Sequence, residues 1–468
     1  MRSNASLKHS ACSLLAAMAL AIFASGTSAQ PLTERPTHLP GEALAGAEAI
    51  ERLTTTMNPC PCAVENAPPA PPPFGGPIRE RPKLTGDWFG YRSSLRDGGI
   101  TIDVSTTQFY QGVTNGGLER SFPYGGRNDY FLTLDGEKLG LWKGFFIKLH
   151  GETRYGESAN FNTGALSPVN EYLLVPGSTG TVGGLTGAKV SQFLSENTLL
   201  FAGKINLLDD VIQPLTGATG LEGFMNVSLL FNLTLARTLP YSTFGVGIVH
   251  LSDGHPVFTF TVFDTIDRST TNAFNKLFSN GAVLFATATL PTEFFGRPGH
   301  HGLEAAYSSG RYTNISFTPY LDPVAGLVFP GPPTSGSWTV GYLFDQALWV
   351  SPDDPKKVWG VFGKFGIADN NPNTIRWTAT AGISGASPIP GRTADTFGIG
   401  YFFLGISDVL KRSARPLSPL KNEQGVELYY NARITPWVQF TPDIQIVEPF
   451  QRQANTAILF GLRAKIDF

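Results

Sequence analysis

Apolar and polar residues alternate over the last fourteen residues of the chain, 455–468. Successive side chains of an extended strand point to opposite faces. One face of this segment is therefore apolar, with Ile458, Phe460, Leu462, Ala464, Ile466 and Phe468. The other face is largely charged, with Arg463, Lys465 and Asp467. The alternation is typical of a strand between lipid and water, although this segment alone fits the edge strand of a soluble sheet equally well.

Further strand patterns begin at Ile100, some of them alternating and some plain apolar runs. The segment 157–195 is interpreted as a long outer loop because it is rich in Gly, Ser and Thr. Short turns on one side and long loops on the other are typical of outer-membrane barrels. The order of strands is not resolved between Leu207 and Gly223. The pattern predicts an antiparallel transmembrane β-barrel of about 16 strands, at 100–104, 130–134, 145–155, 196–207, 224–235, 241–250, 257–264, 281–290, 302–312, 336–350, 358–367, 374–383, 395–407, 425–435, 437–447 and 455–468.

Composition favours the barrel over a soluble sheet. Charged residues are only 15% of the chain, against about 25% in ordinary soluble domains, yet the mean hydropathy is −0.02. A membrane barrel accounts for both values, because apolar residues facing lipid alternate with polar residues facing the lumen. The net charge of −2 gives no basic footprint for nucleic acid.

The sequence divides the chain into three parts. Residues 1–29 have the charges and the apolar core of an export signal, with cleavage expected after Ala29. Residues 30–83 are rich in proline and are interpreted as a weakly ordered periplasmic tether. Its Cys60 and Cys62 are assigned no role, because a bridge between residues so close would be strained. Residues 84–468 form the predicted barrel domain.

Two sequence blocks resemble a known family. The segment from Leu84 to Asp103 reads LTGDWFGYRSSLRDGGITID, and the segment from Gly425 to Pro449 reads GVELYYNARITPWVQFTPDIQIVEP. Both blocks, together with the closing FGLRAKIDF, resemble the carbohydrate-selective porins of the OprB family. The resemblance implies a short N-terminal helix and a barrel of 16 strands in the bacterial outer membrane. It also implies facilitated diffusion of sugars, mono- or small oligosaccharides, past a constriction lined by Arg and Glu.

The best candidate for sugar contact is a ladder of four residues on one predicted strand: Lys148, His150, Glu152 and Arg154. The opposite face of this strand is mostly apolar. Because Lys or Arg facing lipid at mid-depth costs about 2–4 kcal/mol, we expect the ladder to face the lumen, with Glu152 and Arg154 close to its narrowest part. Alternating signs supply the donors and acceptors that sugar hydroxyls need. A salt-bridge ladder that only stiffens the wall explains the pattern equally well. Weaker candidates of the same kind are Glu427, Arg433, Arg463 and Lys465.

Other functions find less support in the sequence. No Gly-x-Ser-x-Gly elbow occurs, and no catalytic residue is predicted. No metal or cofactor is predicted either, and an enzyme is not expected. An adhesin-like barrel and a secreted sugar-binding β-sandwich remain as alternatives to the porin. The terminal Phe468 is placed where a barrel-assembly machine could bind the last strand. The pattern leaves the sugar unidentified, and a monomer and a trimer are both compatible with it.

Overall fold

The computed structural model describes residues 75–468, apart from 210–214, 217–219, 273, 323–325 and 353. The signal, most of the tether and both tether cysteines lie outside the described residues. A short 3-10 helix, η1 (Trp88–Gly90), and helix α3 (Tyr91–Asp97) precede the first strand. No helix in the described part of the chain has the length and apolar character needed to cross a membrane.

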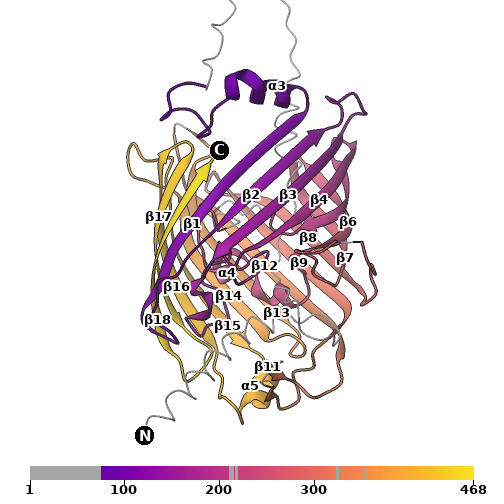
Figure 1. Ribbon diagram of the computed structural model, residues 1–468, viewed down its shortest axis with the longest axis vertical. Coiled ribbons are helices and arrows are strands. Elements are labelled where there is room, and N and C mark those ends of the chain that lie inside the picture. Colours follow the sequence, from indigo (N-terminus) through magenta and orange to yellow (C-terminus); the bar gives the residue numbers. More distant parts are fainter. Residues whose placement is uncertain (1–74, 210–214, 217–219, 273, 323–325, 353) are drawn as a thin grey trace, which may run out of the picture.

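Sixteen antiparallel strands close into a barrel (Figure 1), and β1 pairs with β18 to complete the ring. The barrel strands are β1 (Ile100–Gly117), β2 (Tyr124–Asp135), β3 (Phe145–Gly156), β4 (Val182–Ser195), β5 (Thr198–Asn206), β6 (Ser242–Ser252), β7 (His255–Asp264), β8 (Ala282–Phe294), β9 (Arg297–Tyr312), β12 (Thr334–Val350), β13 (Val358–Ala368), β14 (Ile375–Ala386), β15 (Thr396–Ile406), β16 (Glu423–Thr435), β17 (Val438–Glu448) and β18 (Asn455–Asp467). This confirms the predicted fold class and strand number.

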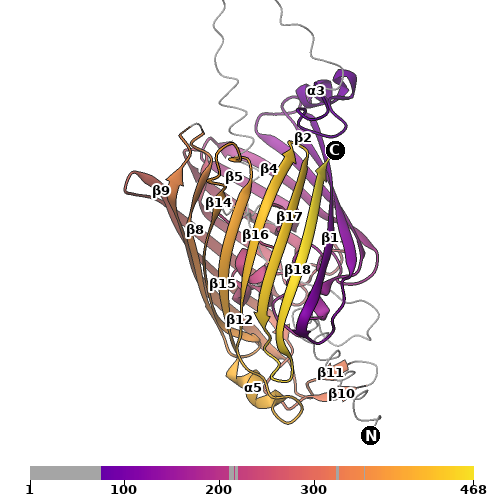
Figure 2. The ribbon, with the colours of Figure 1, turned by 90° about the vertical axis from the view of Figure 1, so that its left-hand side faces the viewer.

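The two ends of the barrel differ. Helix α3 and the C-terminus lie at one end, called here the turn end, where connections such as 196–197, 253–254 and 295–296 are short (Figure 2). The opposite loop end carries helix α5 (Asp408–Ala414) and a small hairpin of β10 (Tyr320–Asp322) and β11 (Gly326–Val328).

Strand β17 shows how the sequence builds the wall. Its residues alternate between exposed and buried from Phe440 to Val447. Phe440, Ile444 and Ile446 lie on the outside, whereas Gln439, Asp443 and Gln445 are buried on the inside. Such alternation places a continuous apolar belt around the barrel. Trp142 and Trp437 lie at the turn end and Trp359 lies near it on β13, and aromatic residues at such positions are typical of the lipid–water boundary of outer-membrane barrels.

Two of the long loops fold back into the barrel instead of leaving it. These are residues 157–181 and 207–241, named here the first and second inserted loops, and nearly all their described residues are buried. The first contains η2 (Ala159–Phe161), and the second contains α4 (Val227–Leu230) and η3 (Leu233–Arg237). Figure 1 shows α4 within the ring of strands.

The inserted loops give the barrel an apolar core at its centre. Leu166 and Val169 of the first loop and Phe224 and Leu229 of the second pack in one cluster with inward-facing wall residues, among them Phe362, Phe402, Val447 and Leu459. The sequence suggested a lumen that is polar throughout. The apolar cluster shows that part of the interior is apolar instead. Apolar positions on the inner wall mark where a loop covers the wall and excludes water.

Two strand assignments made from the sequence are wrong, and the errors cancel in the count. Residues 224–235 form α4 and most of η3, because Asn226 and Asn232 accept hydrogen bonds from backbone N–H groups two residues on and start two helical turns. Their apolar run is buried by the surrounding wall, and such a run cannot be told from a strand by periodicity. Residues 182–195, predicted as loop, form β4, which pairs with β3 and β5.

The segment before the barrel lies against the turn end of the barrel. Trp437 Nε1 donates to the carbonyl of Ile78 at 2.6 Å, and Lys83 forms an ion pair with Asp103 at 3.0 Å. Arg92 donates to the main-chain oxygen of Phe468 at 2.7 Å. Contacts with the barrel thus begin before residue 84. The boundaries at residues 29 and 83 stay predictions.

Candidate functional site in the lumen

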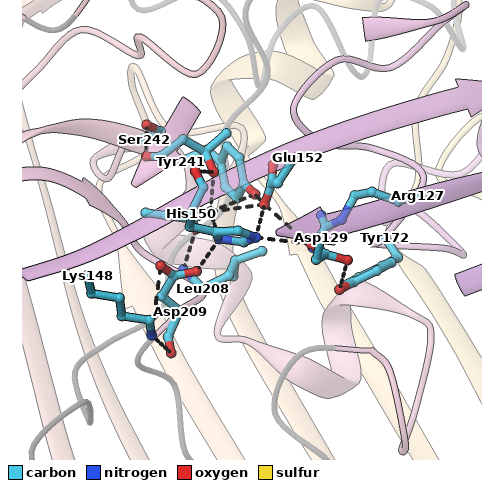
Figure 3. Close-up of polar contacts among 12 residues, drawn as sticks. Arg127, Asp129, Lys148, His150, Glu152, Tyr172, Leu208, Asp209, Tyr241 and Ser242 are labelled. Carbon is cyan, nitrogen blue, oxygen red and sulfur yellow. Dashed lines mark hydrogen bonds and ion pairs between the residues drawn. The ribbon is translucent and has the colours of Figure 1, made fainter. Parts of the chain in front are cut away.

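His150 lies at the centre of a polar network on the inner face of β2 and β3 (Figure 3). Its Nδ1 lies 2.6 Å from Asp209 Oδ1, and its Nε2 lies 3.1 Å from Asp129 Oδ1. The ring of Phe131 stacks on the imidazole with centroids 3.9 Å apart. Arg127 approaches Asp129 at 3.1 Å and Glu152 at 3.6 Å.

The inserted loops complete this network. Tyr172 of the first loop donates to Asp129 Oδ2 at 2.7 Å, and its ring lies 3.4 Å from the Arg127 guanidinium carbon. Tyr241 of the second loop donates to Glu152 Oε1 at 2.5 Å. Asp209, also in the second loop, lies within 3.9 Å of Lys148 Nζ. Burial alone would raise the pKa of the Asp209 carboxyl, but the charges of His150 and Lys148 outweigh it and hold the pKa below its usual value.

Asp129, His150 and Glu152 are close enough together to bind a metal ion. The guanidinium of Arg127 already lies against both carboxylates, and Asp209 pairs with the remaining imidazole nitrogen. The positive charge that these acids require is therefore supplied by side chains of the chain itself. The arrangement suits an ion-pair network better than a metal centre.

A cavity of about 220 Å³ leads from the turn end to this network. Three cations and three carboxylates line it: Lys83, Arg127 and Lys465, with Asp103, Asp209 and Asp467. Most of them pair with one another, as Lys83 does with Asp103 and Lys465 does with Asp467 at 3.1 Å. Apolar surface from Phe131, Leu208 and Leu221 lies beside them. The cavity therefore offers donors, acceptors and an apolar face without a strong net charge.

The candidates Lys148, His150, Lys465 and Arg433 lie at or near this water-accessible space. Lys148 is partly exposed, and His150 and Lys465 line the cavity. Lys465 bonds Glu222 of the second inserted loop at 3.3 Å, and Arg433 approaches the same carboxylate at 3.7 Å. These two cations lower the pKa of Glu222 against the effect of its burial. The second loop is thus tied to β16 and β18 at Glu222.

The other four candidates are buried, as His150 is, but unlike His150 they do not line the cavity. Glu152 is held inside the network by Tyr241 and by Asn206 Nδ2, which donates to it at 3.0 Å. Arg154 is 0% exposed and donates to the carbonyls of Leu173, at 3.2 Å, and Gly180, at 2.7 Å, both in the first inserted loop.

Glu427 and Arg463 hold the second inserted loop in the same manner. Glu427 accepts hydrogen bonds from the backbone N–H groups of Met225 at 2.5 Å and Asn226 at 2.8 Å. Arg463 donates to the carbonyl of Gly220. These two residues therefore bind the backbone of the chain and have no open surface for a solute.

Further wall residues that the sequence analysis did not single out do the same. Glu423 accepts from the N–H groups of Leu166 at 2.6 Å and Ser167 at 2.7 Å. Lys364 donates to the carbonyls of Leu229 and Leu230 at 2.7 and 2.6 Å. Glu427 therefore clamps the short helix α4 before its first turn, and Lys364 clamps it at its end. An acidic group at the start of a helix and a basic group at its end is the order that the helix dipole favours.

The network residues Arg127 and Asp129 were also missed. They alternate along β2 with the outward-facing Tyr130 and Leu132, so the rule that selected the Lys148 ladder applies equally to them. Tyr172, Asp209 and Tyr241 carry no such signal, because loops have no periodicity. Only the folded position of the inserted loops brings them to the site.

A closed 16-stranded barrel with an apolar belt, two inserted loops and a charged inner wall is the structure of an outer-membrane porin. The profile of the family described as "Carbohydrate-selective porin, OprB family" matches residues 119–468. The chain belongs to this family. The block at Leu84–Asp103 that resembles the family lies outside the matched range.

Solved structures agree on the fold. The high-pH structure of Pseudomonas putida OprB superposes with a TM-score of 0.71 at 20% identity, covering 83% of this chain and 99% of that one. The low-pH structure of the same protein gives a TM-score of 0.51 at 15% identity, with the same coverage. No curated protein sequence matches the chain. The family assignment makes the protein a carbohydrate-selective porin of the bacterial outer membrane, which is a channel for sugars.

Glu171 of the first inserted loop is a buried acid from which we expect a pH dependence of this site. It is fully buried, and neither carboxyl oxygen has a hydrogen-bond partner among the described residues. Burial raises its pKa to about 8; Arg127 opposes the shift, and Glu152 and Asp129 add to it. The side chain is therefore neutral at pH 7.

We expect the stability of the folded loop to fall as the pH rises. The folded pKa lies above the unfolded value of about 4.3, so the stabilisation is complete below about pH 4.3 and is lost as the pH rises through about 8. Glu171→Gln should remove this dependence in thermal unfolding followed by near-ultraviolet circular dichroism between pH 6 and 9. Glu157→Gln, at an exposed position of the same loop, should leave it intact. A wild-type profile in Glu171→Gln would show that Glu171 is not the buried acid described.

Proposed function

We propose that sugars pass through the cavity at the turn end and that solutes are selected there. The cavity favours small neutral sugars. The observation that carries the proposal is the pairing of both signs of charge along the cavity beside the apolar faces of Phe131, Leu208 and Leu221. Sugar hydroxyls both donate and accept, so they can bond either member of an ion pair. A charged solute gains one partner and is repelled by the other.

The eight candidate residues divide into two groups under this proposal. Lys148, His150, Arg433 and Lys465 set the charge of the space through which the sugar passes. Glu152, Arg154, Glu427 and Arg463 position the inserted loops and do not touch the sugar. The bonds of the second group to loop backbone or loop side chains support this division. The sugar passes without chemical conversion.

Neutralising the two members of the pair Lys148–Asp209 should shift ion selectivity in opposite directions. Asp209→Asn leaves Lys148 and His150 in excess and should favour anions, whereas Lys148→Gln should favour cations. Both should weaken the block of ion current by monosaccharides, because a paired donor and acceptor is lost. Reversal potentials and sugar titrations of single channels measure the two effects.

Lys411→Gln is the matched control, since Lys411 lies on α5 at the loop end and pairs with Asp408 at 3.3 Å. It should change neither quantity. Wild-type selectivity and sugar block in both Asp209→Asn and Lys148→Gln would place the selective part of the route elsewhere.

We also infer that the barrel-assembly machinery recognises Phe468. The residue follows β18 directly, and its backbone N–H donates to the carbonyl of Val104 at 2.9 Å in the finished barrel. The exposed Phe460 and Leu462 continue the apolar face on the same strand. An extended terminal strand with alternating apolar residues is a form that a partner can bind by strand addition.

Deleting Phe468 should therefore lower the amount of folded, heat-modifiable barrel in the outer membrane. Arg92→Ala removes the contact with the Phe468 main-chain oxygen but leaves the terminal residue in place, so it should assemble normally. Equal losses in both variants would assign Phe468 a purely structural contact in the finished protein.

A further inference from the structure

The outer wall changes character toward the loop end of β9. Leu303 and Tyr307 face outward and are 59% and 53% exposed, as expected for residues against lipid. Tyr307 pairs with the exposed Trp338 of β12, and such aromatic residues lie at the membrane–water boundary. Beyond this pair, the outward positions of β9 are Ser309 and Arg311. The polar residues therefore begin at the level of the lipid headgroups.

A polar cavity of about 380 Å³ opens at this level. Hydrogen-bonding side chains form most of its lining: Ser279, Asn280, Ser309, Arg311 and Ser335. Arg311 is exposed, and its guanidinium has no hydrogen bond or ion pair within the described part of the chain. Its own backbone N–H donates to Asn280 Oδ1 at 3.3 Å, which fixes the strand against the loop 265–281. The unpaired guanidinium is a planar fork of N–H donors, and such a fork suits an anionic group such as phosphate.

An apolar patch on the outer surface belongs to the same loop that lines the cavity. Phe274 and Phe278 pack on Phe244 of β6, with ring centroids 6.0 and 6.1 Å apart. Phe244 has the same parity as Val246 and Ile248, which are exposed on the lipid-facing side. Phe274 is itself 65% exposed. Because Phe278 directly precedes Ser279, the patch adjoins the polar cavity.

We propose that this outer site binds the phosphorylated headgroup of a glycolipid of the outer leaflet, with an acyl chain against Phe274 and Phe278. Arg311 binds the phosphate, and Ser279 and Ser335 bond the sugar hydroxyls. Lys276, exposed on the same loop, adds positive charge. A free phosphate ion would use Arg311 but would have no use for the aromatic patch. The neighbouring apolar and polar surfaces at the membrane boundary therefore favour a lipid.

Binding of lipid A to the full-length protein in detergent, followed by native mass spectrometry, tests the proposal. Arg311→Ala should raise the apparent dissociation constant for diphosphoryl lipid A about tenfold or more, because it removes a charge-assisted contact. The double variant Phe274→Ser, Phe278→Ser should also bind lipid A more weakly. Inorganic phosphate should compete only weakly with lipid A in the wild type and in every variant. Sugar block of the channel should be unchanged in all these variants.

Arg297→Ala is the matched control, since Arg297 is an exposed arginine at the turn end of the same strand. It should bind lipid A as the wild type does. Equal binding by Arg311→Ala and wild type, or an equal loss in Arg297→Ala, would overturn the assignment. Full competition by inorganic phosphate would reduce the site to a simple anion site and would also overturn it.

Discussion

Buried acidic and basic side chains of the barrel wall bind the backbone of the inserted loops, and the interior of the protein depends on this interaction. Glu423 and Glu427 accept backbone N–H groups, whereas Arg154, Lys364 and Arg463 donate to backbone carbonyls. A buried charge left without partners is strongly destabilising, and loop backbone removed from water has the same need. The wall side chains and the loop backbone satisfy each other's hydrogen bonds, so the wall specifies where the loops lie.

Wall glycines make the close approach of the second loop sterically possible. A Cβ atom at Gly366 would lie 2.0 Å from Asn232 Oδ1, and one at Gly398 would lie 2.8 Å from Phe224. A larger residue at either position would collide with these side chains of the second loop. The loops in turn narrow the lumen and bring Tyr172, Asp209 and Tyr241 to the charged face of β2 and β3. The shape and the polar lining of the lumen thus rest on packing at the barrel centre.

The wall could be predicted from the sequence, because lipid on one side and protein or water on the other impose a period of two. That period identified β17 and β18, and it placed Lys148, His150, Glu152 and Arg154 on the inner face. The inside of the barrel could not be predicted in this way. An inward Phe402 under a loop looks the same in sequence as an outward one, and the run 224–235 is apolar for a reason that only the closed ring supplies. The same limit applies to Glu427 and Arg463, because the period places them on the inner face but does not reveal that a loop covers them.

The most direct test of this account is the single-channel conductance of the double variant Glu427→Ala, Lys364→Met. These changes remove the clamps before and after α4 and leave the strand pairing of the wall untouched. We expect the barrel to retain heat-modifiable mobility, its conductance to rise and the block by monosaccharides to weaken, because the second inserted loop is no longer held in the lumen. Wild-type conductance and sugar block in a folded double variant would contradict the claim that wall charges position the loop that narrows the channel.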